Sequence, residues 1–322
     1  MSHSEEGSKS SVIAAICGNV GVAVVKVVAS FMSGSSALFS VAVHSLVDCG
    51  NGALILVGMR KARKAPDFTH PFGSGKELYF YTMVVSLAIF LLGGCVAIFE
   101  GVQAVRHALS GAVEPGEPLV GYIVLVLAAI IEGASLRVAL KNFNAARGTT
   151  KPLAFIREAK DPSLYTVVLE DSAAEMGLLF ALFGMVATQI TGNAVFDGAA
   201  SICIGLLLCG VASLLLSETK DLLVGEGVSA DEVDEMRLIA EDDPRVTEAG
   251  GILTLYMGPT SMLVVMDISL APNVPVAQVD EVTDGIEKRI KARWPETAQV
   301  YIEIESVSVC LREQEEQERW EE

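Results

Sequence analysis

The stretch that decides the fold is SALFSVAVHSLVDCGNGALILVG, at residues 36–58. A helix needs about 20 predominantly apolar residues to cross the hydrocarbon core of a bilayer, and this run is long enough. Its interior nevertheless carries an imidazole, His44, and a carboxylate, Asp48. Such side chains are costly at this depth, so each must be paired, hydrated or functional. Their four-residue spacing puts both on one helix face, where they can converge on one cation.

Similar apolar runs occur on both sides of this one. The sequence has 51% hydrophobic residues and a mean hydropathy of +0.48, which is too apolar for a soluble protein of 322 residues. We therefore predict an α-helical membrane protein with a six-helix bundle. The expected spans are residues 11–33, 36–59, 78–106, 119–141, 163–190 and 194–217.

The positive charges fix the expected orientation. Lys and Arg gather in the loops after the second and fourth spans, and cytoplasmic loops retain positive charge. Both termini are therefore expected in the cytoplasm, and the first helix is expected to be retained because no cleavage site follows it. The net charge of −17 comes largely from residues after Lys220, and no basic surface for nucleic acid is apparent.

The sequence after the last span has the composition of a soluble domain. Helix-like patterns at 230–242 and 276–293 and strand-like patterns at 252–257, 262–270 and 299–305 give the order αββαβ, typical of a small ferredoxin-like (metallochaperone-like) domain. We expect a membrane domain at 1–217, a cytoplasmic α/β domain at 218–306 and an acidic tail at 307–322, which lacks a core pattern.

A second polar group lies in the fifth expected span, PSLYTVVLEDSAAEMGLLFALFG at 162–184. Asp171 and Glu175 repeat the four-residue spacing, and Glu170 adjoins them. Like charges repel in a low dielectric, and a bound cation would remove that penalty. At about 1.5 Å per residue, His44, Asp48 and this acidic group all come near the bilayer midplane, where carriers hold their substrate. We therefore predict one shared cation site.

Other polar residues inside the spans have several interpretations. Lys26, Glu100 and Asp197 fall toward the outer half, and we expect ion pairs among them. Asn19 is either an accessory ligand or an interhelical hydrogen-bonding group. Glu132 is expected to face the bundle or the interface rather than to bind metal.

Three segments resemble one known family: GNVGVAVVKVVASFMSGSSALFSVAVHSLVDCGN (18–51), HPFGSGKELYF (70–80) and FDGAASICIGLLL (196–208). Together they are similar to the cation diffusion facilitators, divalent cation/proton antiporters of the zinc-transporter type. The resemblance implies a homodimer whose cytoplasmic domain assists dimerisation. It also implies a transport site to which the second span gives His44 and Asp48 and the fifth gives Asp171. His70 matches a position that carries an accessory metal site in some members.

The sequence departs from the family pattern in two places. The family's fifth-span histidine is here Val167, so the fourth ligand is Glu175 or Glu170, a water, or absent. No histidine follows His107, so the soluble domain lacks the imidazoles that bind regulatory zinc in other members. The outward carboxylates of this domain are expected to be solvated or to hold a weaker, harder cation. They are Asp267, Glu303 and Glu305.

These features predict a secondary transporter in the bilayer that exports a divalent cation in exchange for protons, with His44 as the proton carrier. Zinc is the first choice, but one imidazole among carboxylates also suits Mn²⁺, Fe²⁺ or Co²⁺. No organic cofactor is expected. An intramembrane hydrolase is disfavoured because no HExxH or GxSxG motif occurs. The alternative is a transport-deficient metal sensor or scaffold. A bacterial inner or plasma membrane is the expected location.

Overall fold

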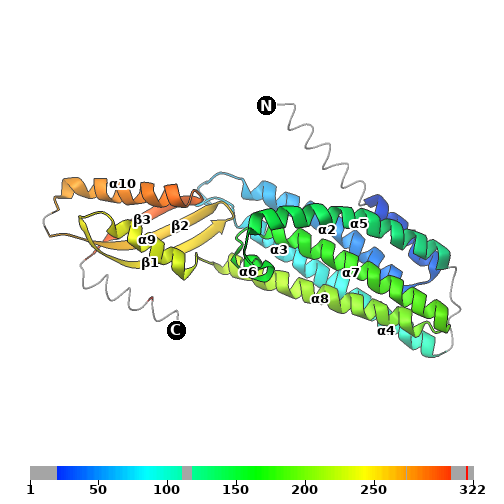
Figure 1. The fold of residues 1–322 in the computed structure, drawn as a ribbon. Coiled ribbons are helices and arrows are strands. Elements are labelled where there is room, and N and C mark those ends of the chain that lie inside the picture. The colour runs from blue at the N-terminus through cyan, green and yellow to red at the C-terminus, as the bar shows by residue number, and fades with distance from the viewer. Residues whose placement is uncertain (1–19, 111–117, 273, 306–316, 318–322) are drawn as a thin grey trace. The chain divides into compact units, whose positions relative to one another are not determined.

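The computed structural model describes residues 20–110, 118–272, 274–305 and 317. The chain divides into two compact units, each described by itself. The membrane unit comprises Met1–Arg60 and Phe80–Lys220, and the soluble unit comprises Lys61–Tyr79 and Asp221–Glu322. Figure 1 labels their helices and strands.

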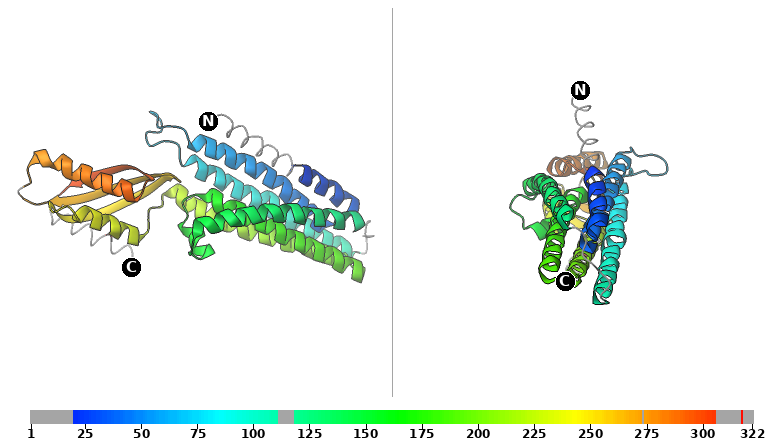
Figure 2. Two further views of the ribbon diagram at one scale, coloured as in Figure 1. Left: turned by 45° about the horizontal axis from the view of Figure 1, so that its top comes forward. Right: turned by 90° about the vertical axis from the view of Figure 1, so that its right-hand side faces the viewer.

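Within the described ranges, five helical segments are long and apolar enough to cross a membrane. They are α2 (Ser36–Ala62), the continuous run α3 (Glu77–Ala88), η1 (Ile89–Cys95) and α4 (Val96–Leu109), then α5 (Pro118–Arg147), α7 (Pro162–Thr191) and α8 (Val195–Val224). A shorter apolar helix, Val20–Ser33, is the described part of the first predicted span. The right-hand view of Figure 2 looks along this bundle and shows α5 and α7 side by side.

The outward surface of the bundle is apolar. Large side chains from different helices are between 59% and 75% exposed, including Phe31, Phe99, Ile130, Phe183 and Leu206. Exposed apolar surface of this extent is a liability in water, whereas the lipid hydrocarbon accommodates it. The chain is a multi-pass integral membrane protein.

Local signals set the ends of α7. Asp161 is its N-cap and accepts a hydrogen bond from the backbone N–H of Ser163 at 3.0 Å, while Pro162 takes the first helical position. Gly192 ends the helix at a φ of 65°, a conformation that favours glycine. A short helix before it, α6 (Pro152–Glu158), was not predicted from the sequence.

Glycines allow α8 to lie against η1 and α4 with almost no side chain between them. A Cβ added at Gly101 would come 2.7 Å from the carbonyl oxygen of Gly198, and one at Gly205 would come 2.7 Å from that of Gly94. In each helix the two glycines lie about two turns apart and therefore on one face. Small residues at such positions are the usual means of close helix packing in membranes.

The soluble unit has the predicted order αββαβ: α9 (Ala230–Glu241), β1 (Val246–Gly258), β2 (Ser261–Leu270), α10 (Val276–Arg293) and β3 (Thr297–Ile304). The sheet order is β1-β2-β3, in which β1 pairs antiparallel with β2 and β2 pairs parallel with β3. The fold class predicted from the sequence is confirmed. β1 begins earlier than predicted, and its pairing with β2 has irregularities between Val246 and Ile252.

Alternation along β2 builds the core of this unit. Four of its side chains, spaced two residues apart, are fully buried: Met262, Val264, Met266 and Ile268. They share a hydrophobic cluster with the buried face of α10, formed by Val282, Ile286 and Ile290. Successive strand residues point to opposite faces, so Asp267 lies on the other side of the sheet.

Candidate functional site

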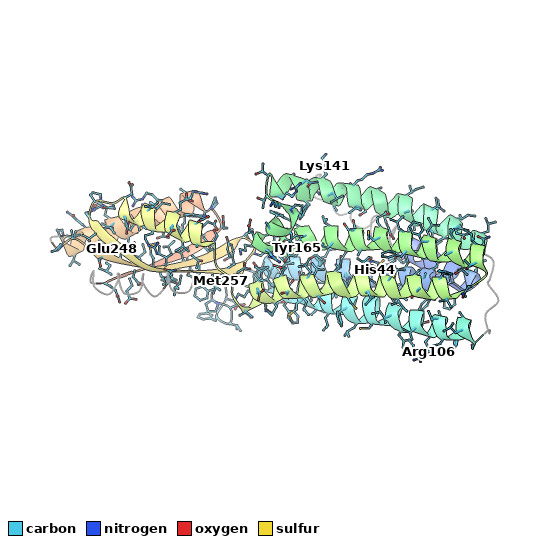
Figure 3. The ribbon with its side chains drawn as sticks, turned by 60° about the horizontal axis from the view of Figure 1, so that its bottom comes forward. His44, Arg106, Lys141, Tyr165, Glu248 and Met257 are labelled. Carbon is cyan, nitrogen blue, oxygen red and sulfur yellow. The ribbon has the colours of Figure 1, made fainter. Side chains whose placement is uncertain are left out.

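His44 lies in the interior of the membrane unit with only 2% of its side chain exposed. Figure 3 shows it partway along the bundle, between Tyr165 and Arg106. Its Nδ1 is 3.4 Å from Oδ1 of Asp48, but neither ring nitrogen has a hydrogen-bond partner among the described residues. Burying polar atoms without partners costs free energy. An imidazole in this position is therefore suited to binding an ion that enters the bundle.

Three carboxylates from three helices line one cavity of about 60 Å³ next to this histidine. They are Asp48 of α2, Glu132 of α5 and Asp171 of α7. Two hydroxyls, Ser45 and Ser135, also line it. Because a water molecule takes about 30 Å³ in the liquid, the cavity has room for a small cation with few waters. Carboxylate and hydroxyl oxygens are ligands that divalent cations accept.

Hydrogen bonds hold two of these carboxylates in place. Oδ2 of Asp171 accepts a hydrogen bond from Ser135 Oγ at 2.9 Å, which joins α7 to α5. Glu132 Oε1 accepts from the ammonium of Lys26, which also donates to Ser45 Oγ at 2.8 Å. The predicted ion pairs of Lys26 with Glu100 or Asp197 are wrong, because Lys26 turns toward α5. Glu132 lines the cavity, in line with its expected bundle-facing position.

Glu170 and Glu175 do not line this cavity. Glu170 is buried, and its Oε1 accepts a hydrogen bond from Nδ2 of Asn51 at 3.0 Å. Glu175 points at α5, since a Cβ added at Gly133 would come 2.9 Å from its Oε1. Within the described ranges, no three His, Cys, Asp or Glu side chains are grouped closely enough to hold a metal ion. The structure therefore brings Asp48 and Asp171 to one cavity and sets His44 beside Asp48, while Glu170 and Glu175 lie outside the lining of this cavity.

Val167 lies one turn before Asp171 on α7 and is 40% exposed. It does not line the cavity. This position therefore gives no ligand on the α7 side, where the resembling family has an imidazole. Asn19, the other accessory candidate of the membrane unit, lies outside the described residues.

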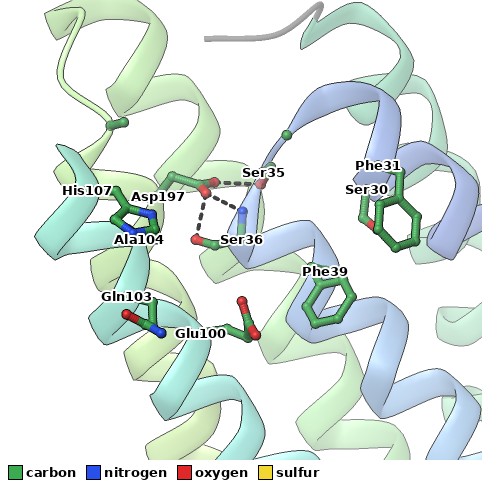
Figure 4. A pocket seen from close by; sticks show the side chains of 12 residues that line it. Ser30, Phe31, Ser35, Ser36, Phe39, Glu100, Gln103, Ala104, His107 and Asp197 are labelled. Carbon is green, nitrogen blue, oxygen red and sulfur yellow. Dashed lines mark hydrogen bonds between the residues drawn. The ribbon is translucent and has the colours of Figure 1, made fainter. Parts of the chain in front are cut away.

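A second cavity, of about 390 Å³, lies where α2 and α8 begin, beside α4 (Figure 4). Asp197 occupies one wall and accepts hydrogen bonds from Ser35 Oγ at 2.5 Å, Ser36 N at 2.6 Å and Ser36 Oγ at 2.8 Å. The carboxylate thus caps the N-terminus of α2, where backbone N–H groups lack helical partners. Glu100 lines the same cavity.

The accessory candidates of the soluble unit lie in two places, on the sheet and in the segment that contains His70. Asp267 and Glu303 are direct neighbours across the parallel β2–β3 pair, and Glu305 follows the end of β3. His70 is more than half exposed, and its Nδ1 is 3.5 Å from Oδ1 of Asp67. The backbone N–H of His70 donates to Asp67 and lowers the pKa of that carboxyl below its usual range. His70 also lines a cavity of about 360 Å³ with Leu255 and Met257.

Comparison with known proteins identifies both parts of the chain. Residues 12–224 match the family model described as the cation efflux transmembrane domain, and residues 228–307 match that of the cation efflux protein cytoplasmic domain.

Individual relatives agree with these matches. Over 239 residues, 73% of this chain and 41% of the relative, the chain is 32% identical to the mouse protein named proton-coupled zinc antiporter SLC30A9, mitochondrial. It is 31% identical to metal tolerance protein C4 of Arabidopsis thaliana over 71% of this chain and 50% of that protein. It is 24% identical to the cation-efflux pump FieF of Escherichia fergusonii over 90% and 89% of the two chains. The chain spans half or less of the length of the first two relatives. On the two family matches, which together cover most of its residues, this chain belongs to the cation diffusion facilitator family of cation efflux proteins.

Proposed function

We propose that this protein is a secondary transporter that exports a divalent metal cation from the cytoplasm in exchange for protons, with zinc as the first-choice cargo. The observation that carries the proposal is the cavity between α2, α5 and α7. Carboxylates from three helices line it inside a bilayer-spanning bundle, where unpaired charge is costly. A cation that visits the cavity offsets this cost and can pass when the helices move.

Asp48 and Asp171 are the proposed carboxylate ligands, and His44 is the proposed imidazole ligand and proton carrier. His44 needs only a small side-chain movement to meet an ion held by Asp48, because their facing atoms are already 3.4 Å apart. Metal binding requires a neutral imidazole and ionised carboxylates, so metal affinity falls as the pH falls. A proton gradient can therefore drive release on the acidic side.

Glu170 and Glu175 remain candidates for the fourth ligand position, and a water molecule is the alternative. In the conformation described, Glu170 is bonded to Asn51 and Glu175 points at Gly133, which favours water as the fourth ligand. Asp267, Glu303, Glu305, His70 and Asn19 are proposed only as accessory positions. We further propose a homodimer assisted by the soluble domain, both termini in the cytoplasm, and a bacterial inner or plasma membrane. The cytoplasmic-domain match supports dimerisation, whereas the mouse relative is named as mitochondrial.

The test uses the full chain in proteoliposomes with an imposed pH gradient. Zn²⁺ uptake and proton counterflow are recorded for wild type, Asp48→Asn, Asp171→Asn and His44→Ala. The control is His107→Ala, an exposed histidine on α4. We expect each site variant to abolish coupled flux and the control to retain it. Zn²⁺ binding without flux in wild type would instead identify the sensor or scaffold alternative, and unchanged flux in Asp48→Asn would reject the site.

A further inference from the structure

The ammonium group of Lys26 lies directly behind the wall of the proposed transport cavity. The side chain is fully buried, and its nitrogen donates to Ser45 Oγ at 2.8 Å and to Glu132 Oε1. Ser45 and Glu132 both line the cavity, as does Val22, one turn before Lys26. A buried lysine is rarely tolerated without a carboxylate partner, so this contact fixes where the positive charge lies.

Glu132, the partner of Lys26, has a second carboxylate oxygen that no described residue holds by a hydrogen bond. Oε2 of Glu132 is buried and has no hydrogen-bond partner among the described residues. Glu132 therefore has one oxygen held by a fixed cation, and its side chain lines the cavity proposed for the cargo. The Lys26–Glu132 ion pair thus lies at the same cavity that Asp48 and Asp171 line.

The charges of the residues that line the cavity can be counted. Its wall contains three carboxylates, Asp48, Glu132 and Asp171, and one ammonium is bonded to one of them. When the three lining acids are ionised, two negative charges remain uncompensated at the cavity wall; Glu170 and Glu175 do not line the cavity and are outside this count. Electroneutrality in a low dielectric then favours a cation of charge two over one of charge one or three.

We propose that Lys26 is a tethered counter-cation that neutralises Glu132 and thereby sets the cavity to accept a divalent cation. This inference rests on the proposed transport function and deepens it. Lys26 is a positioning residue in this scheme, since it acts through Glu132 and does not touch the cargo. Without its charge the cavity would hold an ion more tightly and release it more slowly.

The experiment measures Zn²⁺ and Tb³⁺ dissociation constants for the full-length protein in nanodiscs. Replacing Lys26 by Met should tighten Zn²⁺ binding about tenfold and Tb³⁺ binding about thirtyfold, because the added attraction scales with the charge of the ion. In proteoliposomes the KM for Zn²⁺ and the maximal rate should both fall. Lys26→Arg should keep wild-type values. The matched control, Arg137→Met, removes an exposed positive charge from α5 and should change neither constant.

The double variant Lys26→Met/Glu132→Gln decides between charge and structure. It restores two uncompensated carboxylates, so both dissociation constants should return to near wild type, whereas Glu132→Gln alone should weaken Zn²⁺ binding about tenfold. If Lys26→Met does not fold, the comparison of the double variant with Glu132→Gln still decides. Unchanged or weaker Zn²⁺ binding in Lys26→Met, or a double variant as weak as Glu132→Gln, would overturn the proposal. These constants are equilibrium values, so they are separate from a failure of wild-type flux, which would reject the transport function.

Discussion

Asn51 of α2 donates a hydrogen bond from Nδ2 to Oε1 of Glu170 on α7 at 3.0 Å, and both side chains are buried. These residues are 119 positions apart in the chain. The contact joins the two helices that carry Asp48 and Asp171. It also gives a hydrogen-bond partner to Glu170, which the sequence analysis named as a candidate ligand. In the conformation described, Glu170 therefore positions α7, and it would have to leave Asn51 to serve as the fourth ligand.

Glu170→Gln should therefore retain transport, because the glutamine carbonyl can accept the same hydrogen bond. Glu170→Ala should instead leave the buried Asn51 amide without this acceptor and destabilise the bundle by about 1–3 kcal/mol. Thermal unfolding in detergent and Zn²⁺ flux in proteoliposomes measure the two effects. The neighbouring variant Asp171→Asn is the matched comparison and should lose flux. A loss of flux in Glu170→Gln as complete as in Asp171→Asn would assign Glu170 as a ligand.

Replacing Val167 by His should shift the preference of the site toward Zn²⁺ over Mn²⁺ by about tenfold, because an added imidazole favours the softer ion. Val167 does not line the cavity, but it lies one turn from Asp171 on the same helix face, so the longer side chain of a histidine at this position can extend toward an ion held by Asp171. Competition flux with mixed ions reports the shift, and Val167→Ala is the control. Equal preference in Val167→His and wild type would mean that this turn of α7 does not reach the cargo.

Hydropathy and spacing alone predicted the five membrane-spanning helices found among the described residues, the αββαβ order and the bounds of α10. They succeed because a bilayer demands apolar length and a sheet demands alternation, which are both one-dimensional properties of the sequence. The predicted end of the last span is less accurate: α8 continues as a helix to Val224, past the expected limit at 217.

The partners of Lys26 and Asp197 could not be obtained in the same way. Sequence spacing gives the depth of a residue in the bilayer, but not the rotation of its helix against five others. Lys26 therefore had two expected partners at similar depth, and the structure gives it Glu132 of α5 instead. The π-helical segment Ile89–Cys95 shows the same limit, since it has no composition that marks it within a long apolar run.

Adding side chains at the helix contact of α4 with α8 should destabilise the membrane unit. Gly101→Ala and Gly198→Ala would each place a Cβ within 3 Å of backbone atoms of the facing helix, so the helices must separate. Gly210→Ala is the matched control on α8, because its Cβ would meet nothing within 4 Å. We expect the melting temperatures of the first two variants to be lower than that of wild type, and the melting temperature of the control to be unchanged. Equal melting temperatures for all three would show that this contact is loose in the bilayer.

The turn between α9 and β1 should make the soluble unit sensitive to acid. Oδ1 of Asp243 accepts from Arg245 Nε at 2.9 Å and Oδ2 accepts from Nη2 at 2.8 Å. These hydrogen bonds lower the pKa of Asp243 from 3.8 to about 2. A carboxyl with a depressed pKa contributes stability that is present above its unfolded pKa and lost as the pH falls through its folded pKa.

Asp243→Asn should therefore lower the stability of this unit at neutral pH by about 1 kcal/mol, since Arg245 is partly exposed and water screens the pair. Between about pH 4 and pH 2 the wild type should lose this advantage and approach the variant. Hydrogen exchange of the backbone amides of Asp243, Arg245 and Val246 measures the effect locally, which avoids treating a two-unit membrane protein as two-state. The exposed neighbour Asp242→Asn is the control and should follow wild type. A constant difference between Asp243→Asn and wild type across this pH range would contradict the ion pair as its cause.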